Sequence, residues 1–253
     1  MDAIGVIGID AATQIRKTGL AMGEIRGAKG QLLRAYRPKN LVEEIAQFID
    51  EGPERILLAV DAPLGWPKAL GESLVLHEAG LGLGVPLKES HCLFRRHTDT
   101  VVKKNTGKLP LDVGANFIAR TAHSILTQLQ EIPRFTKKRI ALKMAWETEL
   151  DPGVFMIEVY PGATLKAHQI SSPGYKKGAN EGEKARAQII EDLRQRMDLP
   201  PDTALMLEND DVLDAALCVL SGFDFLQNKT IGPTAEELPL ATKEGWIWCR
   251  PLP

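Results

Sequence analysis

Cysteine, net charge and long hydrophobic runs are all scarce in this sequence. The three cysteines are odd in number and widely spaced, which argues against a disulfide-linked secreted domain and favours reduced thiols. With 31 basic and 33 acidic residues the formal charge is -2, so no global positive field attracts nucleic acid or an anionic membrane. Binding to such partners would therefore depend on local patches.

Segments for targeting or membrane insertion are also not expected. No apolar run approaches the roughly 18 to 20 residues of a membrane span. The first ten residues, MDAIGVIGID, carry an acid where a signal peptide needs a positive flank. We therefore expect a cytoplasmic protein without membrane partners, and the sequence leaves its oligomeric state open.

The order of predicted elements favours a mixed α/β sheet. Three strands come first, over residues 3–10, 18–25 and 31–37. Asn40 precedes a helical repeat that ends at Gly52 and Pro53, and the apolar run that follows over residues 55–61 is typical of a strand buried on both faces. With a strand over 154–160 and right-handed crossovers, these segments predict a five-stranded sheet with an antiparallel meander and parallel strands.

The remaining segments flank or interrupt this sheet. The residues from about 62 to 110 are rich in Gly and Pro and then basic, and we interpret them as an insertion or lid containing a helix over 69–79. No change in composition marks a second domain, so residues 1–253 are expected to form one domain. The other expected segments are helices over 114–129, 184–197 and 210–225, a mobile polar stretch over 174–183 and a terminal strand over 246–249.

Carboxylates gather at one predicted edge of the sheet. Asp10 and Asp61 end two of the parallel strands and Glu158 lies near the end of a third, where α/β sheets bind their ligands. Asp211 and Asp214 are three residues apart, so they share a helix face. Such a cluster suits Mg²⁺ or Mn²⁺, and two such ions about 4 Å apart hydrolyse phosphodiesters. The pattern predicts a divalent-metal-dependent nuclease.

Five ordered motifs carry a resemblance to a known family. The motifs are GIDAA (8–12), VDAPLGWP (60–67), RRHTD (95–99), IEVYPGATL (157–165) and DDVLDAALCVLSG (210–222). Together they are similar to the family called domain of unknown function 429, whose members are described as predicted nucleases of the ribonuclease H-like superfamily, and the order of elements resembles its Holliday-junction resolvase branch.

This resemblance implies a ribonuclease H-like fold and a set of metal ligands. Carried over by position, the metal-binding acids would be Asp10, Asp61, Asp211 and Asp214. Resolvases usually have Glu where Asp61 stands, and Glu158 in its Tyr-Pro context belongs to the narrower family. These five acids are the predicted catalytic residues.

A basic segment supplies the predicted contacts to nucleic acid. Arg95, Arg96, Asp99, Lys103 and Lys104 lie in the insertion, near the predicted acidic edge. Arginine and lysine are the usual ligands of phosphate groups, so we expect these residues to bind substrate. The alternative is a solvated surface loop.

Other interpretations of the same residues stay open. A strand-end aspartate often only forms a turn, Glu158 has Arg120 as a possible structural partner, and Asp210 or Asp211 has the position of a helix cap. Two other functions are open as well. One is an ATP-binding kinase or ATPase of related fold, favoured by Gly8-x-Asp10 with Thr13. The other is a non-catalytic ribonuclease H-like binding scaffold.

Overall fold

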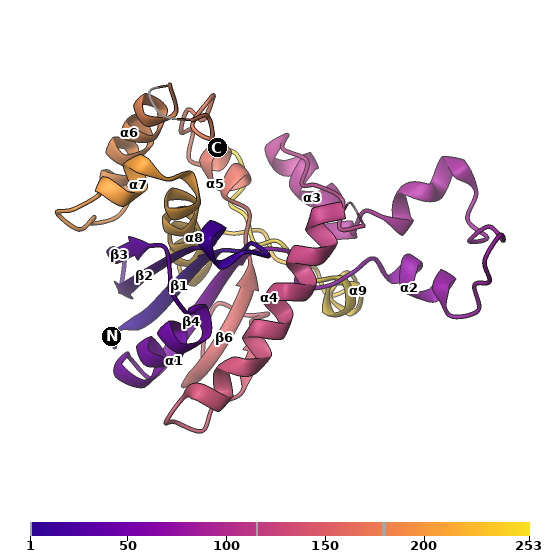
Figure 1. Cartoon of the computed structure of the whole chain (residues 1–253), viewed down its shortest axis with the longest axis horizontal. Coiled ribbons are helices and arrows are strands. Elements are labelled where there is room, and N and C mark those ends of the chain that lie inside the picture. The colour runs from indigo at the N-terminus through magenta and orange to yellow at the C-terminus, as the bar shows by residue number, and fades with distance from the viewer. Residues whose placement is uncertain (1, 115, 179–180) are drawn as a thin grey trace.

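The computed structural model describes residues 2–114, 116–178 and 181–253. It contains one six-stranded sheet of order β3-β2-β1-β4-β6-β5, with helices on both faces (Figure 1). The strands are β1 (Ile4–Asp10), β2 (Gly19–Arg26), β3 (Lys29–Tyr36), β4 (Arg55–Asp61), β5 (Leu142–Met144) and β6 (Gly153–Glu158). The mixed α/β class is confirmed, and the arrangement is consistent with a ribonuclease H-like fold.

The sheet combines the two pairing directions that the chain order predicts. β1, β2 and β3 form an antiparallel meander, and β1, β4 and β6 are parallel neighbours. The sixth strand, β5, was not expected: it pairs in parallel with β6 over only three residues, which is too short to produce an alternating sequence pattern.

Helices cover the sheet and form the structure around its edge. They are η1 (Ile15–Lys17), α1 (Leu41–Glu51), α2 (Lys68–Leu74), η2 (Leu87–Leu93), α3 (His97–Thr106), α4 (Asn116–Phe135), α5 (Pro161–Ala167), α6 (Glu181–Arg194), α7 (Ala204–Glu208), α8 (Asp210–Leu226) and α9 (Leu238–Glu244). The helix after Asn40 is confirmed, because the Asn40 side chain accepts a hydrogen bond from the Glu43 amide.

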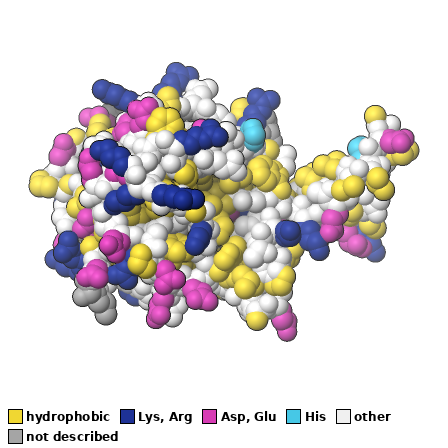
Figure 2. All heavy atoms as spheres, turned by 90° about the horizontal axis from the view of Figure 1, so that it is seen from below, with side chains coloured by type: hydrophobic (Ala, Val, Ile, Leu, Met, Phe, Trp, Pro, Cys, Tyr) yellow, Lys and Arg dark blue, Asp and Glu magenta, His cyan; other side chains and the backbone are white. Residues whose placement is uncertain are grey.

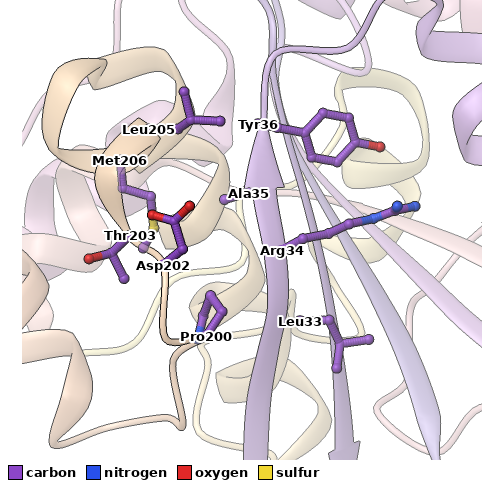
Figure 3. A pocket seen from close by; sticks show the side chains of 9 residues that line it. All are labelled: Leu33, Arg34, Ala35, Tyr36, Pro200, Asp202, Thr203, Leu205 and Met206. Carbon is purple, nitrogen blue, oxygen red and sulfur yellow. The ribbon is translucent and has the colours of Figure 1, made fainter.

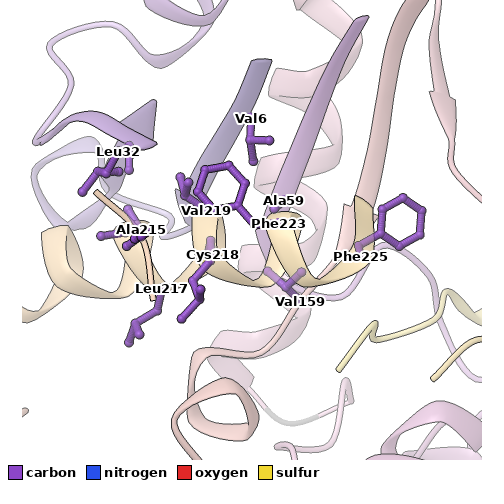
Figure 4. Packing of buried hydrophobic residues seen from close by; sticks show 14 of the residues in the cluster. Val6, Leu32, Ala59, Val159, Ala215, Leu217, Cys218, Val219, Phe223 and Phe225 are labelled. Atoms are coloured by element: carbon purple, nitrogen blue, oxygen red, sulfur yellow. The ribbon is translucent and has the colours of Figure 1, made fainter. Parts of the chain in front are cut away.

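Alternate residues of β1 pack against opposite layers. Val6 belongs to a cluster that contains much of α8, whereas Ile7 and Ile9 belong to a second cluster with α1 and α4. Figure 4 shows Val6 and Ala59 facing α8 residues such as Val219 and Phe223. A central strand buried on both faces explains why β1 and β4 read as continuous apolar runs.

The predicted insertion has a fixed base and a projecting part. Residues 68–95, which we call the arm, contain α2 and η2 and extend away from the sheet (Figure 1). Hydrophobic side chains gather along it (Figure 2), and Leu76 and Leu87 are at least 90% exposed. The helix expected over 69–79 ends at Leu74, and the basic segment after the arm forms α3 rather than a loop.

Several boundaries differ from expectation for local reasons. The helix expected over 114–129 continues to Phe135, past Pro133. The terminal segment around residues 246–249 makes isolated bridges from Ile247 to Glu158 and from Cys249 to Ile231 instead of a strand. The helix expected over 184–197 begins at Glu181, which shortens the segment expected to be mobile. Residues 179–180 of that segment, and residue 115 of the expected helix 114–129, lie outside the described residues.

Among the described helices, none is long and apolar enough to cross a membrane.

Candidate functional site

Two aspartates lie side by side where β1 and β4 end. Asp10 is the last residue of β1, Asp61 is the last residue of β4, and the parallel register pairs them directly. Asp10 is an even number of residues from Val6 in β1, and Asp61 is an even number from Leu57 and Ala59 in β4. The side chains of these three hydrophobic residues pack on the α8 side. Since side chains alternate along a strand, both carboxylates point toward the face that α8 covers. The predicted convergence of Asp10 and Asp61 follows from this register.

α8 brings a third carboxylate, Asp214, to the same place. Asp214 is fully buried in the second turn of the helix. The helix lies very close to the sheet because Gly8 and Gly19 have no side chains. A Cβ on Gly8 would collide with the Ala215 carbonyl oxygen, and a Cβ on Gly19 with that of Asp211. These two glycines therefore set how closely Asp214 approaches the strand ends.

Two residues that the sequence interpretation missed hold Asp214. The Tyr175 hydroxyl donates a hydrogen bond to one carboxylate oxygen at 2.9 Å, and the Lys176 ammonium lies 2.7 Å from the other. Both come from the segment that we expected to be mobile, and Tyr175 is instead buried. Only the polar, Gly-containing composition of that segment was visible in the sequence, and composition does not reveal which of its side chains turns inward.

Burial raises the pKa of all three carboxylates, and the charge of Asp214 raises those of Asp10 and Asp61 further. Burial and the charges of Asp214 and Asp61 raise the pKa of Asp10 well above its usual value. Burial, followed by the charge of Asp214, raises the pKa of Asp61 to about 8, although Lys176 acts in the opposite direction. Burial also raises the pKa of Asp214, against the lowering effects of Lys176 and Tyr175. Only Asp214 contacts a cation, so without a bound cation burial and like charge favour the protonated forms of Asp10 and Asp61.

A cavity of about 320 Å³ opens onto Asp10 and Asp61. We call it the acidic cavity, and its walls include Pro63, Pro110, Leu111, Ile118, Thr121, Tyr160 and Lys176. The lining is mixed: apolar side chains lie beside the charged groups of Asp10, Asp61, Glu158, Arg96 and Lys176. Of the 62–110 insertion, Ala62, Pro63, Arg96 and Pro110 contribute to this lining and the arm does not, so the proposed lid role of the arm stays a prediction.

Asp211 lies at the edge of this group rather than inside it. Its carboxylate contacts Arg37 at 3.2 Å and is partly exposed. The question of which acid caps α8 is also answered: neither Asp210 nor Asp211 does so, because Asn209 accepts hydrogen bonds from the Asp211 and Val212 amides. Asp214 is therefore the member of this acidic run that faces the strand ends.

Glu158 lies at the same edge of the sheet, but its carboxylate has different neighbours. Its register partner Val60 packs in the cluster with α1 and α4, so alternation directs Glu158 away from the α8 face. Its carboxylate oxygens accept hydrogen bonds from both terminal nitrogens of Arg96, at 2.7 and 2.8 Å. The partner of Glu158 is thus Arg96 and not Arg120.

Arg96 and Asp99 are buried together, Arg96 in the lining of the acidic cavity, and their role in substrate binding stays a prediction. Arg96 is 1% exposed and its guanidinium also contacts Asp99 at 2.9 Å. Although burial alone would lower it, the charges of Glu158 and Asp99 raise the pKa of Arg96 above its usual value. This buried cation between two carboxylates links α3 to β6. Removing one partner would leave the other charges buried and unpaired, which destabilises the fold.

The other basic residues stay at the surface. Arg95 contacts Asp112 at 3.0 Å, and the Lys103 ammonium donates to the Gly107 carbonyl. Lys103 and Lys104 are exposed on α3, and neither belongs to the lining of the acidic cavity. Their role in substrate binding stays a prediction.

The fit of a metal ion depends on the number of ligands it needs. Within residues 2–114, 116–178 and 181–253, no group of three or more His, Cys, Asp or Glu side chains has the geometry of a metal site. Mg²⁺ usually keeps several waters and binds through one or two carboxylates together with substrate phosphates. Among the described residues, none donates a hydrogen bond to the carboxylate of Asp10 or Asp61, so these two carboxylates fit this mode.

A second pocket lies at the edge strand β3, two strands away from β1. It measures about 270 Å³ and lies between the edge strand β3 and the segment that leads into α7 (Figure 3). Leu33, Ala35, Leu205 and Met206 supply much of its wall. Asp202 is the only acid among its described lining residues, so this pocket lacks the clustered carboxylates of the acidic cavity.

Comparison with known proteins identifies the family of this chain. The family model described as protein of unknown function (DUF429) matches residues 8–237. The chain belongs to the DUF429 family. The match spans the strand ends, the arm and α8, so it contains every residue of the acidic cavity except Ile247. No curated protein and no solved structure matches this DUF429 chain.

Proposed function

We propose that this protein is a hydrolase of phosphodiester bonds in nucleic acid that depends on Mg²⁺ or Mn²⁺. One observation carries the proposal: Asp10 and Asp61 are register partners at the carboxyl edge of parallel strands, with Asp214 beside them, and they open into a cavity that also contains Lys176. Clustered, partly buried carboxylates with raised pKa values are typical of functional sites.

Asp10 and Asp61 are the residues that would hold the ion. Within the described residues no cation contacts either carboxylate, and a divalent ion would lower the pKa of both carboxyls and favour their ionised form. When bound, such an ion lowers the pKa of a coordinated water and stabilises negative charge on a phosphoryl oxygen. Asp211, which is paired with Arg37, would act from the edge of this centre, whereas Glu158, which is paired with Arg96, lines the same cavity as Asp10 and Asp61.

Lys176 and its partners would position the phosphate. The Lys176 side chain is more than half exposed while its ammonium contacts buried Asp214, so it reaches from the protein toward the cavity. Asp214 and Tyr175 thereby act as positioning residues for a cation that can pair with a phosphate oxygen. The apolar part of the lining would exclude water from the remainder of the cavity and strengthen these electrostatic contacts.

Cleavage assays with a matched pair of variants test this proposal. Purified protein with Mn²⁺ or Mg²⁺ is incubated with single-stranded, duplex, hybrid and branched substrates. We expect cleavage by the wild type, a loss of at least about 100-fold in Asp10→Asn on the scale of electrostatic catalysis, and full activity in Asp151→Asn. Asp151 is an exposed aspartate away from the cavity lining.

Two outcomes would overturn the proposal. The first is that none of the four substrates is cut with either ion. The second is that Asp10→Asn cuts as fast as the wild type, since the carboxylate at the centre of the site would then contribute nothing to the reaction.

A further inference from the structure

A second depression continues from the acidic cavity along α4. It measures about 570 Å³ and lies between the 12–18 connection after β1 and α4 residues from His123 to Gln128. We call it the outer groove. The acidic cavity is lined by Ala11 and by Thr121 of α4, the positions that immediately precede these two segments. The cavity and the outer groove are therefore consecutive stretches between the same two elements, along the helix that crosses in front of the sheet in Figure 1.

The chemistry of the outer groove is opposite to that of the cavity. None of its described lining residues is Asp or Glu. Thr13 and Ser124 supply hydroxyl groups, which donate hydrogen bonds to phosphate and sugar oxygens, whereas the Thr127 hydroxyl and the Gln128 amide already donate to His123 and Ser124 within α4. An anionic chain that the carboxylates of the cavity alone would repel thus finds neutral donors next to them.

Exposed cations border this groove without partners. Arg16 and Lys17 form the end of η1 within the 12–18 connection, and Arg120 lies four residues before Ser124, on the same face of α4. Within the described part of the chain none of the three forms a salt bridge, and Arg16 contacts only the Gln14 side chain. Three uncompensated positive charges beside a hydroxyl-lined groove favour a polyanion.

The dimensions favour an unpaired strand over a duplex. At about 320 Å³ the acidic cavity is at the small end of ligand pockets, which suits one nucleotide-sized group enclosed by Pro63, Pro110 and Tyr160. Phe117 is 69% exposed and lies four residues before Thr121 on α4, so it borders the mouth of the cavity. An exposed aromatic next to a positively charged groove is the usual platform for an unstacked base.

We infer that the outer groove binds the sugar–phosphate backbone of a single nucleic-acid strand that enters the acidic cavity past Phe117. The inference rests on the proposed function, because that function supplies the reason for a strand to reach Asp10 and Asp61. Lys17 and Arg120 contact phosphates, the hydroxyl groups of the 12–18 connection and α4 contact the backbone, and Phe117 stacks on one base.

Binding measured without cleavage tests the groove. Fluorescence anisotropy of a labelled single strand of about 12 nucleotides is recorded in EDTA, for the wild type and for the double variant Lys17→Gln, Arg120→Gln. We expect affinity to fall on the order of tenfold, and the slope of log K against log salt to decrease by about 1.4, since each phosphate contact contributes about 0.7. The control double variant Lys184→Gln, Lys229→Gln removes the same charge from other exposed positions and should bind like the wild type.

A matched aromatic pair gives a second readout. Phe117→Leu should weaken binding about tenfold, whereas Phe135→Leu, at the far end of α4 and 50% exposed, should not. All these side chains are exposed, so the variants should unfold at the wild-type temperature.

The outcomes separate this inference from the proposed function. Binding that depends on Lys17 and Arg120 supports the groove even where no substrate is cut. The groove is overturned if the wild type binds no single strand, if the groove and control variants bind equally, or if a blunt duplex binds as tightly. If cleavage is observed together with any of these results, the proposed hydrolase function is retained and the groove alone is rejected.

Discussion

At the scale of single residues, the carboxylates differ in the charge that each one faces. Glu158 is tied to Arg96, Asp211 to Arg37 and Asp214 to Lys176, which leaves Asp10 and Asp61 without a cation of their own. The raised pKa values of these two residues follow from burial and from the nearby charge of Asp214. The two acids that lack a paired cation are thus the two that are register partners on β1 and β4.

The pKa of Asp61 makes stability depend on pH in metal-free protein. Its value of about 8 in the folded chain lies above the roughly 3.9 of an unfolded aspartate, so folding favours the protonated form. Its contribution to stability is full below about pH 4 and is lost as the pH rises through 8. The stability of Asp61→Asn relative to the wild type should therefore rise from pH 5 to pH 9, by on the order of 1.4 kcal/mol per pH unit up to about pH 8.

Thermal unfolding in EDTA at pH 5, 7 and 9 measures this difference. Asp151→Asn serves as the control, because its carboxylate is exposed and the variant should track the wild type at every pH. A constant gap between Asp61→Asn and the wild type, or a variant that loses stability relative to the wild type between pH 5 and pH 9, would contradict the assigned pKa.

At the scale of elements, the position of α8 against the sheet decides the geometry of the site. The helix is buried along nearly its whole length and carries Asp214 in its second turn. Gly8 of β1 and Gly19 of β2 allow its backbone to lie directly on the strands. The spacing of Asp214 from Asp10 is therefore a property of helix–sheet packing and not of either residue alone.

Gly8→Ala should separate α8 from the sheet. The added methyl group would collide with the Ala215 carbonyl and the Val219 backbone, neither of which can rotate away. We expect a loss of about 3 kcal/mol in the free energy of unfolding, measured by denaturant titration, together with loss of cleavage. Gly71→Ala is the control: nothing lies near that position in α2, so it should be neutral or stabilising by about 0.5–1 kcal/mol. Equal stabilities of the two variants would show that α8 tolerates displacement.

At the scale of the whole molecule, one carboxylate joins the two ends of the arm to the body. Glu244 at the end of α9 is nearly buried. It accepts a hydrogen bond from the Lys68 amide at 2.8 Å and another from the His97 amide at 2.7 Å. Lys68 begins the arm and His97 follows its last residues, so a single side chain closes its base.

Glu244→Ala should loosen the arm while the sheet stays folded. Leaving two amides without an acceptor costs about 1–3 kcal/mol each. We expect hydrogen exchange at Lys68 and His97 to accelerate at least tenfold on the basis of that energy, and exchange in β1 and β4 to stay unchanged. Glu72→Ala, which removes an exposed glutamate of α2, is the control. Uniform acceleration across the chain would instead mean that Glu244 supports global stability.

The sequence by itself determined the central part of this protein. The alternation and apolar runs of residues 3–10 and 55–61 specify buried parallel strands, and parallel strands place Asp10 and Asp61 at one edge whatever surrounds them. The capping residue and spacing of α1, and the long apolar face of α8, were predictable for the same reason, because their patterns are local. The family motifs agreed with this order.

Only the tertiary structure decided which charges meet. Arg96 joins Glu158 across 62 residues, Lys176 joins Asp214 across 38, and Arg37 joins Asp211 across 174, and no local pattern encodes such pairs. The basic segment read as a phosphate contact proved partly buried because burial depends on how α3, α9 and β6 pack together. Periodicity and spacing act along the chain, whereas ion pairing and burial act through space, and the second set of facts becomes available only when the chain has folded.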